Sequence, residues 1–465
     1  MNAVEVAKIN QIYTEYFEII DSYFGSIKHY LTGSEDSHID LGSKMARYPL
    51  VSDLIIDAID EIDSTIDNFW QKNTRTIVDF IRSRSSLRCV YSGDITPMIL
   101  EDFVKKSALY IDSIILPDPV FNLTLFQKQV ILDKKYYLQK LIRHVFNIWK
   151  LKDLILAKPS EKIIFILPIN LHLVNTDDRQ KLISTADRKF TEYVSKIFDE
   201  NFKNGEECLE ILGKETTSQS IFEKIKKQDL LPQIFRSQES LHQFLLDFSN
   251  TGKFAKFKDN ESVGWDFAVY LQSQFIRVQE HRYFCDILKA EPIYDYELPW
   301  FFFNYEIGGF DMDAAIANAL QKEKFNWINR VPLSAIEVLR SENKLDYMRS
   351  VLRHGITDLK AKNDTDLIVV GQQIEKNLQD AFKRQEGEII SLQKQVSVIV
   401  KKDIPIVGAG FLAGFIPGIS PIISLLFAGR DIKNALEQKN VLNKQIDSKQ
   451  KDVISLLIKS YEQDD

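Results

Sequence analysis

The chain has 465 residues, of which 45% are hydrophobic and 27% are charged, and its formal net charge is −7. This length suits two or three domains, and the composition is that of a folded globular protein. The net negative charge argues against a surface that coats nucleic-acid phosphates over its whole extent.

The cysteines and the first residues bear on the compartment. Cys89, Cys208 and Cys285 are odd in number and far apart, without a CxxC motif. This pattern indicates a reducing compartment and argues against a disulfide framework or a zinc cluster. The first twenty residues lack the basic and apolar regions of a signal peptide. We therefore expect a cytoplasmic protein, with membrane association left to a later segment.

Two long helices are predicted at the beginning of the chain. Apolar residues recur every three or four positions over 3–31 and again from Pro49 to about Arg84. Four carboxylates repeat at helical spacing on another face of the second helix: Asp53, Asp57, Asp60 and Asp67. Without the ExxH pairs of a di-iron bundle, a solvent-exposed face is the expected use of this row.

The period of the apolar residues changes near 88–170. The segments 110–117 and 162–168 are isoleucine-rich runs that stop at a proline, as buried strands do. Helical patterns cover 96–108 and 125–156. We therefore predict a mainly α, multi-domain fold with a small α/β portion in this region.

The middle of the chain has the pattern of a helical domain. Helices are expected over 177–202, 219–228, 237–249 and 264–290. The aromatic run Trp300–Phe303 is expected in the core. We divide the chain into an N-terminal helical or α/β domain (1–170), a helical middle domain (171–355) and a C-terminal helical hairpin (356–465).

The C-terminal part contains a run of 26 residues without one charge, 404–429. Pro417 and Pro421 divide this run into pieces that are too short, as helices, to cross a hydrocarbon core of about 30 Å. Amphipathic helical patterns flank it over 358–402 and 430–462, and the second has a coiled-coil seam. We predict a hairpin of two antiparallel arms that turns within an apolar tip.

The apolar tip has two uses: packing inside the protein, or contact with a membrane or an apolar partner surface. The residues expected to make such a contact are Phe411, Leu412, Phe415, Ile416, Ile419, Ile422, Leu425, Leu426 and Phe427. The plan is similar, in architecture only, to helical pore-forming toxins that carry an apolar hairpin at the end of a helical stalk. No motif assigns a family.

Three functions follow as hypotheses. The first is a non-enzymatic bacterial effector, toxin-like or acting in antiviral defence, whose tip contacts a membrane or an apolar protein surface. The second is a scaffold that forms a homo-oligomer through the C-terminal arms and buries the tip. The third is a metal-dependent nuclease. The first two need no cofactor, and we predict none.

The nuclease hypothesis rests on the order of a PD-(D/E)xK signature. Pro117-Asp118 precedes Asp133-Lys-Lys135, and such carboxylates hold a divalent metal while the lysine activates or positions water. Asp118 follows a predicted strand, as the signature requires. Asp133, however, opens a helical pattern where the signature needs a strand.

Nucleic acid is a weaker candidate partner. The basic residues Lys134, Lys135, Lys140 and Arg143 are interleaved with aromatic residues, a combination that can bind a phosphate backbone and stack on bases. The same pattern is typical of one amphipathic helix, and the net negative charge favours that interpretation.

Other motifs are absent or incomplete. The glycine-rich segment 408–414 resembles a dinucleotide turn, but Pro417 and Pro421 break the helix that such a turn needs. The sequence has no P-loop, no GxSxG elbow and no HExxH zinc motif. No metal site is therefore predicted outside the nuclease hypothesis.

Overall fold

The computed structural model is mostly helical, with one small four-stranded parallel sheet, which confirms the predicted fold class at this level. It describes residues 3–28, 49–84, 86–92, 97–121, 134–157, 164–168, 176–232, 235–250, 263–294, 297–307, 311–322, 325, 328, 345–361, 367–403, 441 and 444–445. The chain divides into two compact units, one of Met1–Lys322 with Thr357–Val370 and one of Glu323–Ile356 with Gly371–Asp465. The predicted boundary at 170 falls within the first unit.

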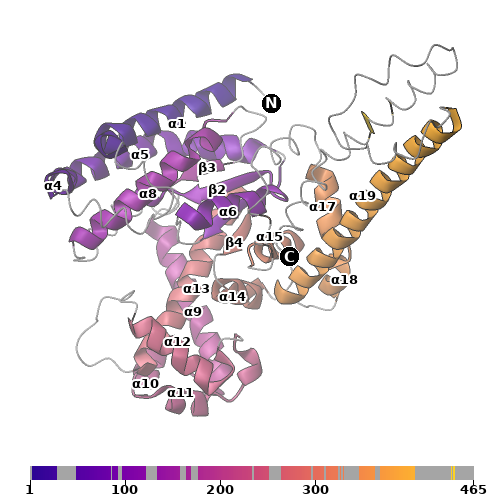
Figure 1. Cartoon of the computed structure of the whole chain (residues 1–465). Helices are drawn as coiled ribbons and strands as arrows, with labels where there is room; N and C mark the ends of the chain where they lie inside the picture. The colour runs from indigo at the N-terminus through magenta and orange to yellow at the C-terminus, as the bar shows by residue number, and fades with distance from the viewer. Residues whose placement is uncertain are drawn as a thin grey trace. The chain divides into compact units, whose positions relative to one another are not determined.

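The sheet belongs to the first unit and has the strand order β3-β2-β1-β4 (Figure 1). Its strands are β1 (Arg88–Ser92), β2 (Ser113–Pro117), β3 (Ile164–Leu167) and β4 (Glu291–Tyr294). Val90 of β1 pairs with Ile115 on one side and Pro292 on the other, in parallel register. Nearly all strand residues are buried, as in parallel sheets that are covered on both faces. The sequence pattern predicted β2 and β3 and missed β1 and β4.

In the described part of the chain, six helical segments accompany the first three strands. They are α1 (Ala3–Phe24), η1 (Gly25–Ile27), α4 (Pro49–Asp57), α5 (Ile59–Ser83), α6 (Pro97–Ala108) and α8 (Lys134–Ile155). The predicted helix from Pro49 to about Arg84 is interrupted by a turn at Ala58. α6 connects β1 to β2, and α8 lies between β2 and β3, so both are crossover helices of a parallel sheet.

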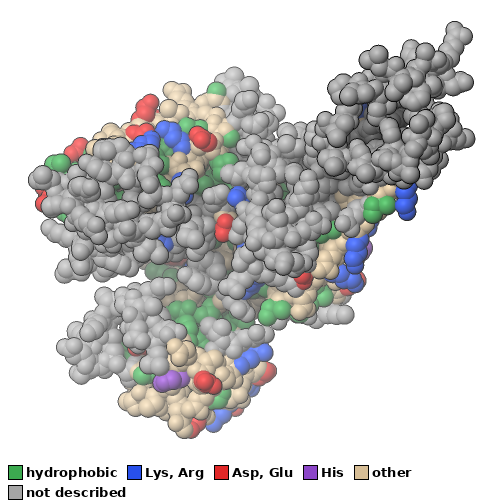
Figure 2. Space-filling model, viewed as in Figure 1, with side chains coloured by type: hydrophobic (Ala, Val, Ile, Leu, Met, Phe, Trp, Pro, Cys, Tyr) green, Lys and Arg blue, Asp and Glu red, His purple; other side chains and the backbone are tan. Residues whose placement is uncertain are grey.

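A helical insertion separates β3 from β4. It contains α9 (Thr176–Phe198), α10 (Gly205–Leu212), α11 (Ser218–Lys224), η2 (Gln228–Leu230), α12 (Gln238–Asn250) and α13 (Val263–Leu288). We call α10, α11 and α12 the helical lobe. A Cβ atom at Gly264 would lie 1.9 Å from the carbonyl oxygen of Leu212, so α13 begins in close contact with this lobe. On the face seen in Figure 2 the lobe carries basic and acidic side chains side by side.

Two side chains block the free edges of the sheet. The hydroxyl of Tyr13 lies 3.0 Å from both the amide nitrogen and the carbonyl oxygen of Ile166 in β3. At the other edge, Asn318 accepts a hydrogen bond from the amide of Tyr294 (2.8 Å) and donates one to the carbonyl of Pro292 (2.9 Å). Each side chain takes the hydrogen bonds that another strand would make.

Asn318 and the aromatic run belong to two short helices that follow β4. These are α14 (Glu297–Ile307) and α15 (Met312–Ala319). Trp300, Phe302 and Phe303 of α14 are buried, which confirms that the aromatic run is part of the core.

The second unit contains α17 (Leu345–Arg353) and most of α19 (Leu367–Asp403), while α18 (Ile356–Ala361) begins at its boundary. Asn377 of α19 donates hydrogen bonds to the carbonyls of Leu352 (3.2 Å) and His354 (2.7 Å). Gly355 has a φ of 70°, so a glycine in the left-handed region ends α17 and Asn377 satisfies its last carbonyls.

The predicted upstream arm, 358–402, is helical over 358–361 and again from 367. The apolar tip 404–429 lies outside the described residues, as does the downstream arm 430–462 apart from 441, 444 and 445. No helix in the described part of the chain is long and apolar enough to span a bilayer.

Candidate functional site

All four strands are parallel, but the side on which the chain adds them to the sheet changes between β1 and β4. The chain passes from β1 to β2 and β3 on one side and then returns to add β4 on the other side of β1. In open α/β sheets, ligands bind outside the carboxyl ends of the strands at such a reversal. The carboxyl ends here are Ser92 and Tyr294, and the residues that directly follow them, 93–96 and 295–296, lie outside the described residues.

α13 lies antiparallel to β1 and brings two basic side chains to it. The Arg277 guanidinium donates from Nε to the hydroxyl of Ser92 (3.1 Å) and from Nη2 to its carbonyl (2.6 Å). His281, one turn later, lies with Nε2 3.0 Å from the carbonyl oxygen of Val90, to which it donates. Burial lowers the pKa of His281 to about 3, so this imidazole is neutral at physiological pH and serves as a hydrogen-bond donor.

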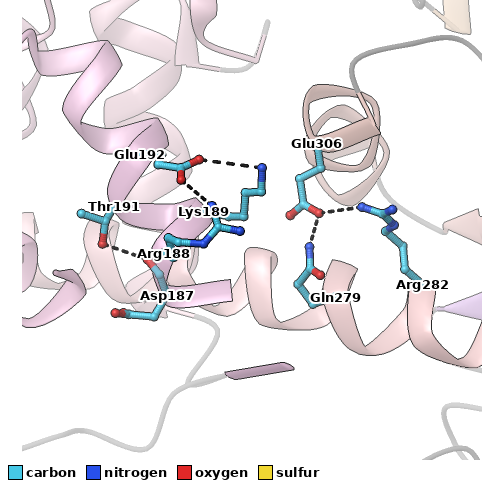
Figure 3. Close-up of polar contacts among 8 residues, drawn as sticks. All are labelled: Asp187, Arg188, Lys189, Thr191, Glu192, Gln279, Arg282 and Glu306. Carbon is cyan, nitrogen blue, oxygen red and sulfur yellow. Dashed lines mark hydrogen bonds and ion pairs between the residues drawn. The ribbon is translucent and has the colours of Figure 1, made fainter. Parts of the chain in front are cut away.

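We call four further polar residues the Glu306 cluster: Gln279 and Arg282 of α13, Tyr294 at the end of β4, and Glu306 of α14, whose charge acts on Tyr294. Both α13 side chains donate to Oε2 of Glu306, Arg282 from Nη1 at 3.3 Å (Figure 3). Tyr294 is 3% exposed, and its ring packs against His281.

Two atoms of the Glu306 cluster have no hydrogen-bond partner among the described residues: the hydroxyl of Tyr294 and Oε1 of Glu306. Neither atom is accessible to solvent, and the Glu306 side chain has no exposed surface. Buried polar atoms without a partner are uncommon in folded proteins, because each loses its hydrogen bonds to water without replacement.

The electrostatics of the cluster favour a carboxyl group that exchanges its proton near neutral pH. Burial raises the pKa of Glu306 to about 7, and the charges of Arg282 and Lys189 oppose that rise. Burial also raises the pKa of Tyr294, with a further contribution from the charges of Cys285 and Glu306. Glu306 can therefore accept or donate a hydrogen bond, and Tyr294 keeps its proton.

Comparison of the chain with protein-family models, with curated proteins and with solved structures gives no match. Evidence on the function therefore comes from the chemistry and the geometry of the side chains.

The second group of charged residues in Figure 3 has an ordinary structural role. Glu192 of α9 pairs with Arg188 at 2.6 Å and with Lys189 at 3.7 Å, one helical turn away along the same helix. Exposed pairs of this spacing stabilise a helix by a few tenths of a kcal/mol.

The row of carboxylates on α4 and α5 faces solvent in large part, since Asp53, Asp57 and Asp60 are exposed. The described residues contain no group of side chains that could hold a metal ion.

Asp118, the first residue of the nuclease signature, is fully buried at the carboxyl end of β2. It accepts hydrogen bonds from the hydroxyl of Tyr16 (2.9 Å), the indole N–H of Trp70 (2.6 Å) and the amides of Val120 and Phe121. Burial raises the pKa of Asp118, and these hydrogen bonds oppose the rise. Its contacts join α1, α5 and the end of β2.

The other predicted site residues are placed only in part. Asp133 lies outside the described residues, and Lys134, Lys135 and Lys140 are in α8, which begins at Lys134, without described side chains. Arg143 is half-buried on the same helix. The segment that the signature needs as a strand is therefore helical from 134 onwards. The tip residues, from Phe411 to Phe427, lie outside the described residues.

The sequence pattern did not single out Arg277, Tyr294 and Glu306. β4 has only four residues and contains Pro292, which is tolerated at the edge of a sheet but weakens the pattern of a strand. α13 is buried on several sides, so its residues do not divide into an apolar and a polar face. The available signal for β4 was a short run of residues that ends in Tyr294 and follows a helix of 26 residues.

Proposed function

We propose that the protein is a non-enzymatic effector, toxin-like or defence-like, whose apolar tip 404–429 contacts a membrane. One observation carries the proposal: 26 residues without a charge begin directly after α19, which ends at Asp403. A helix of 37 residues is about 55 Å long, so α19 is a rigid support for the segment that follows it.

Charges at both ends of the tip favour an anionic membrane. Lys401 and Lys402 precede the tip, and Arg430 and Lys433 follow it. Each basic residue near an anionic lipid surface contributes about 1 kcal/mol, in addition to about 25 cal/mol per Å² of buried apolar surface. Pro417 and Pro421 interrupt the run, which suits shallow insertion of a hairpin better than a single straight crossing.

Flotation with liposomes tests this function. We expect the full-length protein to float with vesicles that contain phosphatidylserine, and to do so less with neutral vesicles. The double variant Phe411→Asp with Leu412→Asp should stay in the bottom fraction. The control is Leu54→Asp with Ile183→Asp, which makes the same chemical change at two exposed sites in α4 and α9. Equal recovery of the wild type and the tip variant at the bottom would reject membrane contact.

The scaffold hypothesis remains the main alternative and has its own test. The seam of the downstream arm includes Leu442 and Ile446. If the arms form a homo-oligomer, light scattering should give a multiple of the 53.9 kDa chain mass, and Leu442→Lys with Ile446→Lys should reduce it to one chain. A monomeric mass for the wild type at all concentrations would reject the scaffold.

A further inference from the structure

We propose that Glu291 and Asp311 form a proton-dependent latch, which holds the first turn of α15 against β4 while the Glu291 carboxyl group carries a proton and releases it when the proton is lost. Both residues belong to the first unit of the chain, Met1–Lys322 with Thr357–Val370. The latch is a regulatory device of this unit and is independent of the proposed contact of the tip with a membrane.

The contact between Glu291 and Asp311 joins two carboxyl groups. Glu291 is the first residue of β4, Asp311 directly precedes α15, and their side chains are hydrogen-bonded to each other. Because ionised carboxylates only accept hydrogen bonds, one of the two groups must carry a proton for this bond to form. Both residues are half-buried, so the proton can exchange with solvent. The contact is therefore attractive in one protonation state and repulsive in the other.

A further carboxylate makes loss of this proton unfavourable. Asp313, in the first turn of α15, adds its negative charge to that of Asp311 at Glu291. Tyr110, which precedes β2, donates a hydrogen bond from its hydroxyl to Asp313. An ionised Glu291 therefore meets two negative charges from the start of α15.

From β1 and α13, two thiols lie near Glu291. Glu291 pairs in register with Cys89 of β1. Burial raises the pKa of the Cys89 and Cys285 thiols, and the charge of Glu291 raises both further, so both thiols stay neutral. On α13, the charges of Asp286 and Arg282 act on Cys285 in opposite directions. The charges that act directly on Glu291 are thus those of the carboxylates at the start of α15.

These surroundings raise the pKa of Glu291 from its usual 4.5 to about 7. Burial contributes most, followed by the charges of Asp311 and Asp313 and by the hydrogen bond to Asp311. The latched state therefore binds the proton more tightly than a released state in which Glu291 is in water. It follows that the latch holds fully below about pH 4.5 and weakens as the pH rises through about 7.

The same helix covers the free edge of β4 (Figure 1). Asn318, near the end of α15, binds the amide of Tyr294 and the carbonyl of Pro292. At the other end, Asp311 accepts a hydrogen bond from the amide of Ala314 (3.0 Å), which fixes it to the first turn. Repulsion of Asp311 from β4 therefore acts, through a helix of eight residues, on the contact of Asn318. Loss of the proton is expected to open the amide of Tyr294 to water.

Hydrogen–deuterium exchange of the full-length protein at pH 6 and pH 8 tests the latch, with rates corrected for the intrinsic pH dependence of amide exchange. If opening returns the pKa of Glu291 from about 7 to 4.5, the population of the open state rises about tenfold over this range. Exchange in 291–294 should rise by the same factor. Wild-type rates that do not change between the two pH values would overturn the proposal.

Glu291→Gln is the decisive variant. The glutamine amide can donate to Asp311 at both pH values, so exchange in 291–294 should be slow and independent of pH. The control is Glu306→Gln, the same change at another glutamate whose pKa is about 7, and the rise should persist in it. A rise that persists in Glu291→Gln would trace the exchange to another group, and an equal reduction in both variants would trace it to global unfolding. Either result would overturn the latch.

Asp311→Asn provides a second test if Glu291→Gln folds poorly. Asparagine is as good a helix N-cap as aspartate, so the hydrogen bond from the amide of Ala314 is kept. The asparagine amide can also donate to an ionised Glu291, so the pH dependence should again be lost, and retention of the wild-type rise would overturn the latch. The tip variant Phe411→Asp with Leu412→Asp should show the wild-type rise. Loss of the rise in that variant would overturn the independence of the latch from the tip.

Discussion

The hydroxyl of Tyr13 lies 3.0 Å from the amide nitrogen of Ile166 and 3.0 Å from its carbonyl oxygen. One phenol in α1 thus takes both hydrogen bonds that the outer edge of β3 presents at this residue. The side chain is fully buried, and burial raises the pKa of Tyr13, so the hydroxyl keeps its proton and can donate and accept at once.

Tyr13→Phe should lower the free energy of unfolding by about 1–3 kcal/mol, because it leaves a buried amide and a buried carbonyl without partners. Urea denaturation followed by circular dichroism measures the change. Tyr23→Phe is the matched control in the same helix, since the Tyr23 hydroxyl bonds to Glu61 and Thr65 near the surface. Equal stabilities of the two variants would contradict the edge role of Tyr13.

Asn318→Ala should have a similar effect at the opposite edge. The Asn318 amide holds the backbone of β4 at Pro292 and Tyr294 and also donates to the carbonyl of Ala314 (2.7 Å). Loss of these three buried hydrogen bonds should cost about 2–4 kcal/mol. Because the edge of β4 is then open, we also expect the variant to aggregate faster than the wild type on storage. Unchanged stability and solubility would argue that water replaces the amide.

Asp118→Ala should be among the most destabilising changes in the first unit. It removes the acceptor from the Trp70 indole, the Tyr16 hydroxyl and two backbone amides, with an expected loss of more than about 3 kcal/mol. Asp118→Asn keeps the shape and one acceptor oxygen and should lose less. Thermal unfolding of both variants measures which of them is less stable.

The same two variants separate a structural role from catalysis. If Asp118 holds a catalytic metal, folded Asp118→Asn must lose magnesium-dependent cleavage of DNA that the wild type performs. Wild-type protein without such cleavage would remove the nuclease hypothesis.

Stability should fall as pH rises through the titration of Glu306. Its pKa is about 7 in the folded protein against a usual value of 4.5, so the folded state binds the proton more tightly than the unfolded state does. The stabilisation is complete below pH 4.5 and is lost by about pH 7. At about 1.4 kcal/mol per pKa unit, the loss is roughly 3 kcal/mol.

Glu306→Gln separates this contribution from that of Glu291. Burial and the charges of the neighbouring Asp311 and Asp313 raise the pKa of Glu291 to about 7 as well. The glutamine resembles the protonated acid, so the stability difference between variant and wild type should move in favour of the variant between pH 5 and 8. Glu192→Gln, at the exposed carboxylate of α9, is the control. Parallel pH profiles for wild type and Glu306→Gln would contradict the assignment.

The spacing of apolar residues predicted the helices and strands whose formation depends on residues close together in the sequence. α1, α6, α13 and most of α5 have apolar residues at helical spacing or a proline at the first helical position, and β2 and β3 are compact isoleucine runs. The turn at Ala58 was missed because apolar residues continue on both sides of it. The row of carboxylates on α4 and α5 was predicted to face solvent, and Asp53, Asp57 and Asp60 are exposed.

The candidate site could not be predicted, because distant segments build it. Arg277 and Ser92 are separated by 185 positions, and Gln279 and Glu306 by 27. The residues become a group only when β4 joins β1, and four residues with a proline carry too little signal to predict that pairing. The tip and its arms were the strongest pattern in the sequence, and their arrangement remains a prediction.

The place of β4 in the sheet has a consequence for biosynthesis. Arg88 and Leu288 are in contact through a hydrogen bond but lie 200 positions apart, so a ribosome makes the whole helical insertion after β1 and before β4. At 5–20 residues per second this takes roughly 10–40 s. During that interval a nascent chain can assemble β1, β2 and β3, and β1 is then an unprotected edge. Contacts between residues so far apart in sequence slow folding, and the open edge of β1 favours aggregation until the last strand is made.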